Sequence, residues 1–169
     1  MAAEPDFSPA QLLLAVAHYT NGENEKCAKE TAAVIGRPGA PAYLYYLHAA
    51  SLMKLGSKEY AAILADLETA THSMKDCSFC YLSLSKLHQE MGNEQAAIAD
   101  LETLVGRVDP GFPNGWYRLA NLYQHAGRTA DADRVLERFE KIKTAQTKNE
   151  AEYLGRFLVP ELNGQDEKR

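Results

Sequence analysis

The stretch WYRLANLYQHAGRTADADRVLERF, residues 116–139, decides the fold. Gly127 lies near its middle, in a short polar segment between two segments whose apolar residues recur with helical spacing. Trp116 stands eleven residues before this glycine and Leu119 stands eight before it, a separation of about one helical turn. A bulky ring and a leucine therefore share one face of the expected first helix.

The same arrangement occurs four times along the chain. The central glycines are separated by 34, 36 and 35 residues, and they are Gly22, Gly56, Gly92 and Gly127. A small residue stands seven positions before each glycine, at Ala15, Ala49, Ser85 and Ala120. Another stands five positions after it, at Cys27, Ala61, Ala97 and Ala132. Small residues at a fixed repeat position predict close contacts between helices.

Each unit is expected to form a helical hairpin, because glycine adopts the left-handed backbone that ends a helix without a Cβ clash. The prolines fall between the hairpins, at Pro38, Pro41, Pro110 and Pro113. A hairpin of about 34 residues cannot bury its apolar face alone, so neighbouring hairpins must stack. We therefore predict an all-α fold, a right-handed superhelical solenoid of antiparallel helix pairs.

The repeat resembles the tetratricopeptide repeat (TPR) family. In the fourth repeat the residues at the family's spacing are Trp116, Leu119, Ala120, Tyr123, Gly127, Ala132 and Phe139. Repeats two and three keep an aromatic at the first of these positions, Tyr45 or Tyr81, whereas repeat one has Gln11 there. A degenerate first repeat is typical of an end cap.

The expected domain organisation follows from this spacing. We predict an N-terminal tail over residues 1–7 and a repeat domain over residues 8–159, followed by a polar tail over residues 160–169. The repeats are expected at about residues 8–40, 41–76, 77–112 and 113–146. After them, Leu154, Gly155 and Leu158 have the spacing of a first helix, and the resemblance implies a capping helix over residues 148–159.

Composition and charge exclude several classes of partner. The net charge is -5 and the isoelectric point is near 5.5, the wrong sign for holding nucleic acid or an anionic membrane by electrostatics. The longest apolar run, residues 12–17, is far shorter than the ~20 residues of a membrane span. No basic leader precedes that run, so a cytoplasmic location is expected, although a chain that had lost an upstream signal would look the same.

The resemblance implies a concave groove, lined by the first helix of each repeat, that binds a protein or peptide. Counting back from each glycine gives the residues expected to face it: Tyr19, Tyr43, Tyr46, Met53, Phe79, Leu82, Lys86, Gln89, Asn114, Tyr117, Asn121, Gln124 and His125. The N-terminal part of this set is apolar and aromatic, and the C-terminal part is rich in amides. We predict apolar anchoring at one end and hydrogen bonding at the other.

Two other interpretations of this surface stay open. The aromatic residues can instead pack against neighbouring helices, or they can form a surface through which the protein self-associates as a homo-oligomer. The several-residue Lys, Arg and Asn clamp with which some family members hold a C-terminal carboxylate is not reproduced, although Lys86, Asn121 and the adjacent Arg118 are of the right type.

A C-x-x-C motif, Cys77-Ser-Phe-Cys80, stands at the predicted start of a helix, where the helix dipole favours a thiolate. A thioredoxin-like role needs a βαβ setting, and a zinc site needs two further ligands, for which His72 and His88 lack a standard spacing. Three cysteines leave one unpaired, which favours a reducing compartment or a packing role. A thiol or metal function is the weaker alternative, and Cys27 is expected in the core.

The chain shows no catalytic pattern. His18 and His88 occupy the repeat position of Tyr123, which favours a packing role, and no Asp or Ser recurs beside them at triad spacing. Acidic residues two apart, such as Asp66 with Glu68, point to different helix faces. We predict a non-catalytic interaction adaptor without a metal or cofactor.

Overall fold

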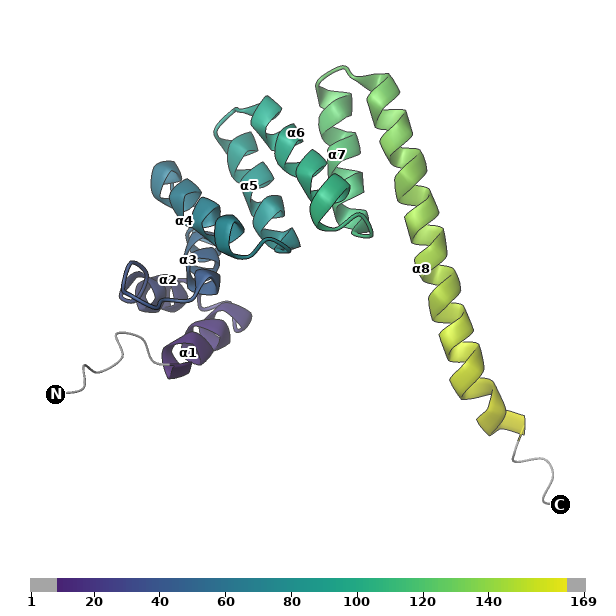
Figure 1. Ribbon diagram of the computed structural model, residues 1–169, viewed down its shortest axis with the longest axis horizontal. Helices are drawn as coiled ribbons and strands as arrows, with labels where there is room; N and C mark the ends of the chain where they lie inside the picture. The colour runs from purple at the N-terminus through teal and green to yellow at the C-terminus, as the bar shows by residue number, and fades with distance from the viewer. Residues whose placement is uncertain (1–8, 164–169) are drawn as a thin grey trace. The chain divides into compact units, whose positions relative to one another are not determined.

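The computed structural model describes residues 9–163, with side chains up to residue 153. The predicted tail over residues 1–7 and the last part of the polar tail, residues 164–169, lie outside this range. The described part contains helices and no strand, which confirms the all-α helical repeat fold. The helices are α1 (Pro9–Thr20), α2 (Asn24–Ala32), α3 (Ala42–Lys54), α4 (Tyr60–Ser73), α5 (Ser78–Glu90), α6 (Glu94–Thr103), η1 (Leu104–Val108), α7 (Pro113–His125) and α8 (Thr129–Asn163) (Figure 1).

The chain divides into two compact units. The first, Met1–Pro110, contains three hairpins, α1 with α2, α3 with α4 and α5 with α6, and the π-helical turn η1 that continues α6. In it the first helices α1, α3 and α5 pack on one another in sequence order (Figure 1). The second unit, Gly111–Arg169, contains the hairpin of α7 and α8.

The glycine turn is confirmed in all four hairpins. The central glycines have φ angles between 71° and 76°, the left-handed region that residues with a Cβ rarely adopt. After α5, Gly92 N–H donates to the Gln89 carbonyl at 3.0 Å and Asn93 N–H donates to the His88 carbonyl at 2.8 Å. The same two bonds follow α1, α3 and α7, so each first helix ends in a Schellman motif.

One repeat differs from the expected register. The small residues five positions after the glycine are buried at Cys27, Ala97 and Ala132, but Ala61 is exposed. Helix α4 begins at Tyr60, four residues after its glycine, whereas the other second helices begin two residues after theirs. This longer turn moves the buried position two residues on, to Ile63, and the predicted role of Ala61 is wrong.

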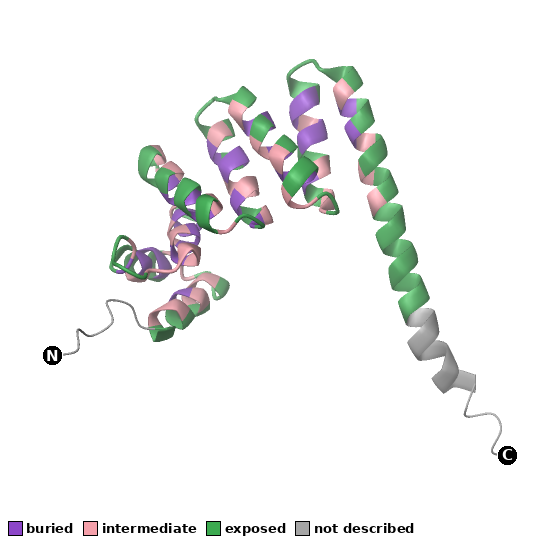
Figure 2. Cartoon of the chain, viewed as in Figure 1, coloured by how far each residue is buried: buried purple, intermediate pink, exposed green. Residues whose placement is uncertain are grey.

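The expected capping helix is not separated from repeat four. Helix α8 runs without a break from Thr129 to Asn163, through the expected end of repeat four and on to the first residues of the predicted polar tail. Neither Gly nor Pro occurs between residues 128 and 154, so nothing in that sequence ends the helix. Figure 2 shows buried residues on α7 and near the start of α8, and exposed residues along α8 up to its last described side chains.

Candidate functional site

Four aromatic rings meet on the first helices of the first unit. Tyr19 comes from α1, Tyr43 and Tyr46 come from α3, and Phe79 comes from α5; we call them the aromatic cluster. The ring centroid of Tyr46 lies 6.3 Å from Tyr19, 5.7 Å from Tyr43 and 4.7 Å from Phe79. The Tyr43 and Phe79 centroids lie 6.2 Å apart in an edge-to-face arrangement. Three consecutive repeats thus contribute to one continuous set of contacts.

Tyr46 is the buried centre of the aromatic cluster. Its exposed fraction is 8%, while Tyr19 and Tyr43 are half-buried and Phe79 is 44% exposed. Burial raises the pKa of the Tyr46 hydroxyl, and the neighbouring Tyr19 hydroxyl raises that pKa further. The prediction that Tyr46 faces a partner is therefore corrected: its ring supports the other three. The internal packing interpretation holds for this residue, because its neighbours cover it on several sides.

One basic side chain, Lys54, lies beside the aromatic cluster. Lys54 places its Nζ 3.8 Å from the centre of the Tyr19 ring, a cation–π contact. Lys86 and Gln89 on α5 are exposed, and Lys86 lies 3.8 Å from Glu90 in an ion pair along the helix. Two predicted residues, Met53 and Leu82, are half-buried apolar side chains.

Of the residues predicted for the polar end, the five from repeat four all lie on α7, in the second unit. The ring of Tyr117, about half exposed, lies 5.7 Å from Phe139 of α8. Asn114 accepts a hydrogen bond from Arg118 Nε at 3.2 Å, and Asn121 is half-buried. The other two are exposed, and they are Gln124 and His125. Helix α7 therefore presents one aromatic ring with amide groups on the same helix.

Cys77 and Cys80 form a disulfide at the start of α5, with both residues buried. A disulfide is typical of an oxidising environment, whereas the sequence favoured a reducing compartment or a packing role for the cysteines. Phe79 lies between the two bonded cysteines, so the bond constrains the backbone that carries the most exposed ring of the aromatic cluster. Cys27 is free and fully buried, as predicted. Among the side chains that the structure describes, residues 9–153, no three His, Cys, Asp or Glu residues gather as metal ligands.

Histidine–carboxylate pairs link helices in the first unit, and sequence reasoning missed them. His48 Nδ1 lies 2.6 Å from Asp66 Oδ2, joining α3 to α4, and His88 Nδ1 lies 2.7 Å from Asp100 Oδ2, joining α5 to α6. The sequence did contain one signal for these pairs. The similar segments ADLETA and ADLETL place both aspartates at the same position of two second helices. Burial raises the pKa of Asp100, against the opposing effect of the bond to His88.

Repeated antiparallel hairpins with a glycine Schellman turn define the chain as having the tetratricopeptide-repeat fold. No protein-family model matches the sequence, and no curated protein matches it either. Within residues 9–163 no helix has the length and apolar character needed to cross a bilayer.

Solved structures of known proteins share this fold at low sequence identity. A crystal structure of MamA matches with a TM-score of 0.77 at 18% identity, over 86% of this chain and 84% of that one. MamA from Desulfovibrio magneticus RS-1 matches with a TM-score of 0.72 at 15% identity, over 83% and 78%. YrrB, described as a TPR protein with an unusual peptide-binding site, matches with a TM-score of 0.68 at 14% identity, over 80% and 68%.

Proposed function

We propose that this protein is a non-catalytic interaction module that binds a peptide or helix of a partner protein on α1, α3 and α5. The observation that carries the proposal is the aromatic cluster, in which a buried ring, Tyr46, holds three more exposed rings from three successive repeats. Rings held in place before binding lose little conformational entropy on binding, so more of the apolar burial contributes to affinity.

The partner chemistry follows from the rings and their border. An aliphatic or aromatic side chain would pack against Phe79 and Tyr43, and the Lys54 ammonium beside Tyr19 would attract an acidic group nearby. The fold supports this class of function, since YrrB, which shares it, is described as having a peptide-binding site. In the second unit, Tyr117 and the amides of Asn121 and Gln124 would supply hydrogen bonds to a partner backbone.

A peptide selection tests the proposal. Peptides are selected from a random phage-displayed library against the full chain, and their affinities are measured by calorimetry for the wild type and two variants. Phe79→Ala removes the exposed ring of the aromatic cluster. Met91→Ala is the matched control, because Met91 is also in the first unit and its exposed fraction, 42%, is close to the 44% of Phe79.

We expect selected peptides to carry apolar anchors and Phe79→Ala to weaken their binding at least tenfold, or about 1.4 kcal/mol. Met91→Ala should leave the affinity within twofold. Circular dichroism must show that both variants keep the wild-type helix content. If no peptide is enriched, or if both variants bind like the wild type, the aromatic cluster is not the binding surface and the proposal is wrong.

Self-association is a second candidate function, supported by the exposed face of α1. Leu14 is 43% exposed, whereas the leucines at the same repeat position, Leu84 and Leu119, are 6% and 2% exposed. Leu13 next to it is exposed as well. Light scattering at increasing protein concentration tests this candidate: a rising mass that Leu13→Gln/Leu14→Gln abolishes supports it, and a constant monomer mass excludes it.

A further inference from the structure

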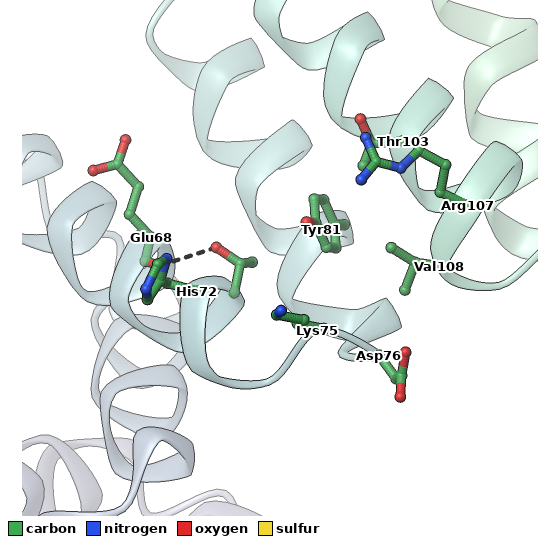
Figure 3. Close-up of a pocket in the computed structure, with 9 residues that line it drawn as sticks. Glu68, His72, Lys75, Asp76, Tyr81, Thr103, Arg107 and Val108 are labelled. Carbon is green, nitrogen blue, oxygen red and sulfur yellow. Dashed lines mark hydrogen bonds between the residues drawn. The ribbon is translucent and has the colours of Figure 1, made fainter.

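A polar pocket lies between the second and third hairpins of the first unit. Its volume is about 550 Å³. Its walls come from α4 and the loop after it, from the start of α5, and from the end of α6 with η1 (Figure 3). None of its residues belongs to the aromatic cluster. The volume is within the range of about 300–1,000 Å³ that is typical of small-molecule sites.

Two basic side chains face this pocket from different walls. Lys75 comes from the loop after α4 and Arg107 comes from η1. In the part of the chain that the structure describes, neither makes an ion pair. In Figure 3 the Lys75 ammonium extends toward the side of the pocket where His72 lies, and the Arg107 guanidinium lies beside Thr103. The two charged groups line opposite walls, so an anion that enters the pocket would be attracted from both sides.

Other hydrogen-bond donors complete the lining. Tyr81, which is half-buried, stands at the centre of the view in Figure 3, and Thr103 is on the opposite wall from His72. Hydroxyl and imidazole N–H groups donate to oxyanions as well as to water. The Thr71 hydroxyl is not counted among these donors, because it already donates to the Glu68 carbonyl at 3.0 Å.

The acidic residues of the lining do not cancel this arrangement. Glu68 and Asp76 are exposed, and Figure 3 shows their carboxylates directed away from the centre, at opposite margins of the pocket. The net charge of the whole chain is -5, so long-range attraction does not concentrate anions on this protein. An anion held here would therefore be held by the local donors.

We propose that this pocket binds a small molecule carrying an oxyanion group, a phosphate or a carboxylate. The oxyanion lies between Lys75 and Arg107 and accepts a hydrogen bond from the Tyr81 hydroxyl. Arg107 supplies a planar pair of donors that fits two oxygens of one group, and Lys75 supplies a compact charge from the facing wall. This site adds a small-molecule ligand to a protein whose proposed partner binds elsewhere on it.

Calorimetric titration of the full chain tests the site with three probes: inorganic phosphate, inorganic pyrophosphate and citrate. Each titration is made in chloride buffer at constant ionic strength, so that general screening is the same for all. Lys75→Gln/Arg107→Gln removes both charges of the pocket. Lys29→Gln/Arg37→Gln is the matched control, because it removes one lysine and one arginine that are also exposed and also in the first unit.

We expect saturable binding of at least one probe, a loss of affinity of tenfold or more in the pocket variant, and a change of less than twofold in the control. Binding of phosphate and pyrophosphate alone identifies a phosphate ligand, and binding of citrate alone identifies a carboxylate ligand. Tyr81→Phe, which keeps the ring, should weaken binding severalfold and serves if the double variant misfolds. The proposal is overturned if no probe binds, or if the control loses as much affinity as the pocket variant.

Discussion

The Nδ1 atom of His88 lies 2.7 Å from Oδ2 of Asp100, across the interface between the two helices of the third hairpin. One repeat earlier, His48 and Asp66 make the same kind of contact at 2.6 Å. The side chains of all four residues are largely buried. Each pair therefore adds a directional polar contact between the two helices of its hairpin, and fixes how the second helix lies on the first.

Replacing His88 should destabilise the first unit. His88→Ala leaves the partly buried Asp100 carboxylate without its partner, and we expect the free energy of unfolding to fall by about 1–3 kcal/mol. His72→Ala is the control, because His72 is exposed and is also on a helix of this unit. Urea denaturation followed by circular dichroism measures both. Equal effects of the two substitutions would show that the pair contributes nothing beyond an ordinary side chain.

The stability of the protein should depend on pH through Asp100. Burial raises the pKa of this carboxyl in the folded state above the ordinary aspartate value of 3.8. As pH rises through 3.8, the unfolded state ionises first, so the free energy of unfolding falls until pH exceeds the folded pKa. Below 3.8 this penalty is absent. The wild type should therefore lose stability relative to Asp100→Asn as pH increases from about 3 to 7.

Carbon NMR of the Asp100 carboxyl measures the pKa of this group in the folded protein directly. The titration midpoint should lie above 3.8 in the wild type. It should rise further in His88→Ala, because the hydrogen bond from His88 acts to lower it. A midpoint at or below 3.8 would contradict the predicted pH dependence.

A side chain at a turn glycine should destabilise the protein, and the cause should be backbone conformation alone. Gly92 has φ of 75°, and a Cβ built on it would meet nothing within 4 Å. Gly92→Ala should therefore cost about 1–2 kcal/mol, the strain of a left-handed residue. Gly106→Ala also meets open space but has no positive φ, and it should be neutral or stabilising by up to about 1 kcal/mol. Thermal unfolding of the two variants separates these outcomes.

The sequence predicted the hairpins because their signal is local. Gly22, Gly56, Gly92 and Gly127 each end a helix by their own backbone preference, and the apolar spacing beside them needs no knowledge of distant residues. The predicted break before residue 148 failed for the converse reason: a break needs a residue that ends a helix, and none is present there.

The candidate site depended on contacts that sequence spacing does not specify. Tyr46 and Phe79 were assigned to one surface by counting along a helix, but their different burial follows from which neighbouring rings cover them. The partners of His48 and His88 lie 18 and 12 residues away. These separations differ because His48 stands eight residues before its glycine and His88 only four, and because the turn after Gly56 is two residues longer. No single sequence spacing therefore identifies both histidine–aspartate pairs.

The disulfide can be verified by counting thiols. The chain has three cysteines, of which Cys77 and Cys80 are bonded and Cys27 is free. Alkylation of the unfolded, unreduced protein should add one label, and alkylation after reduction should add three. In the folded protein Cys27 should react slowly, because it is fully buried and burial raises the pKa of its thiol. Three labels without reduction would show that the pair is not bonded.

Tyr46 and Phe79 should differ in what they contribute to stability, although their ring centroids lie only 4.7 Å apart. Tyr46→Ala removes a buried ring that contacts three others, so we expect a loss of about 3–5 kcal/mol. Phe79→Ala removes a ring that is 44% exposed. Folding buries less apolar area at this ring than at Tyr46, so we expect a smaller loss of about 1–2 kcal/mol.

Urea denaturation of both variants checks this difference, with Met91→Ala as the exposed control. The result also decides how binding data on Phe79→Ala are interpreted. A small stability loss means that a weaker peptide affinity reflects a missing contact with the ligand. If Phe79→Ala destabilises the protein as much as Tyr46→Ala does, the Phe79 ring is a structural part of the core, and the rings left to contact a partner are the half-buried Tyr19 and Tyr43.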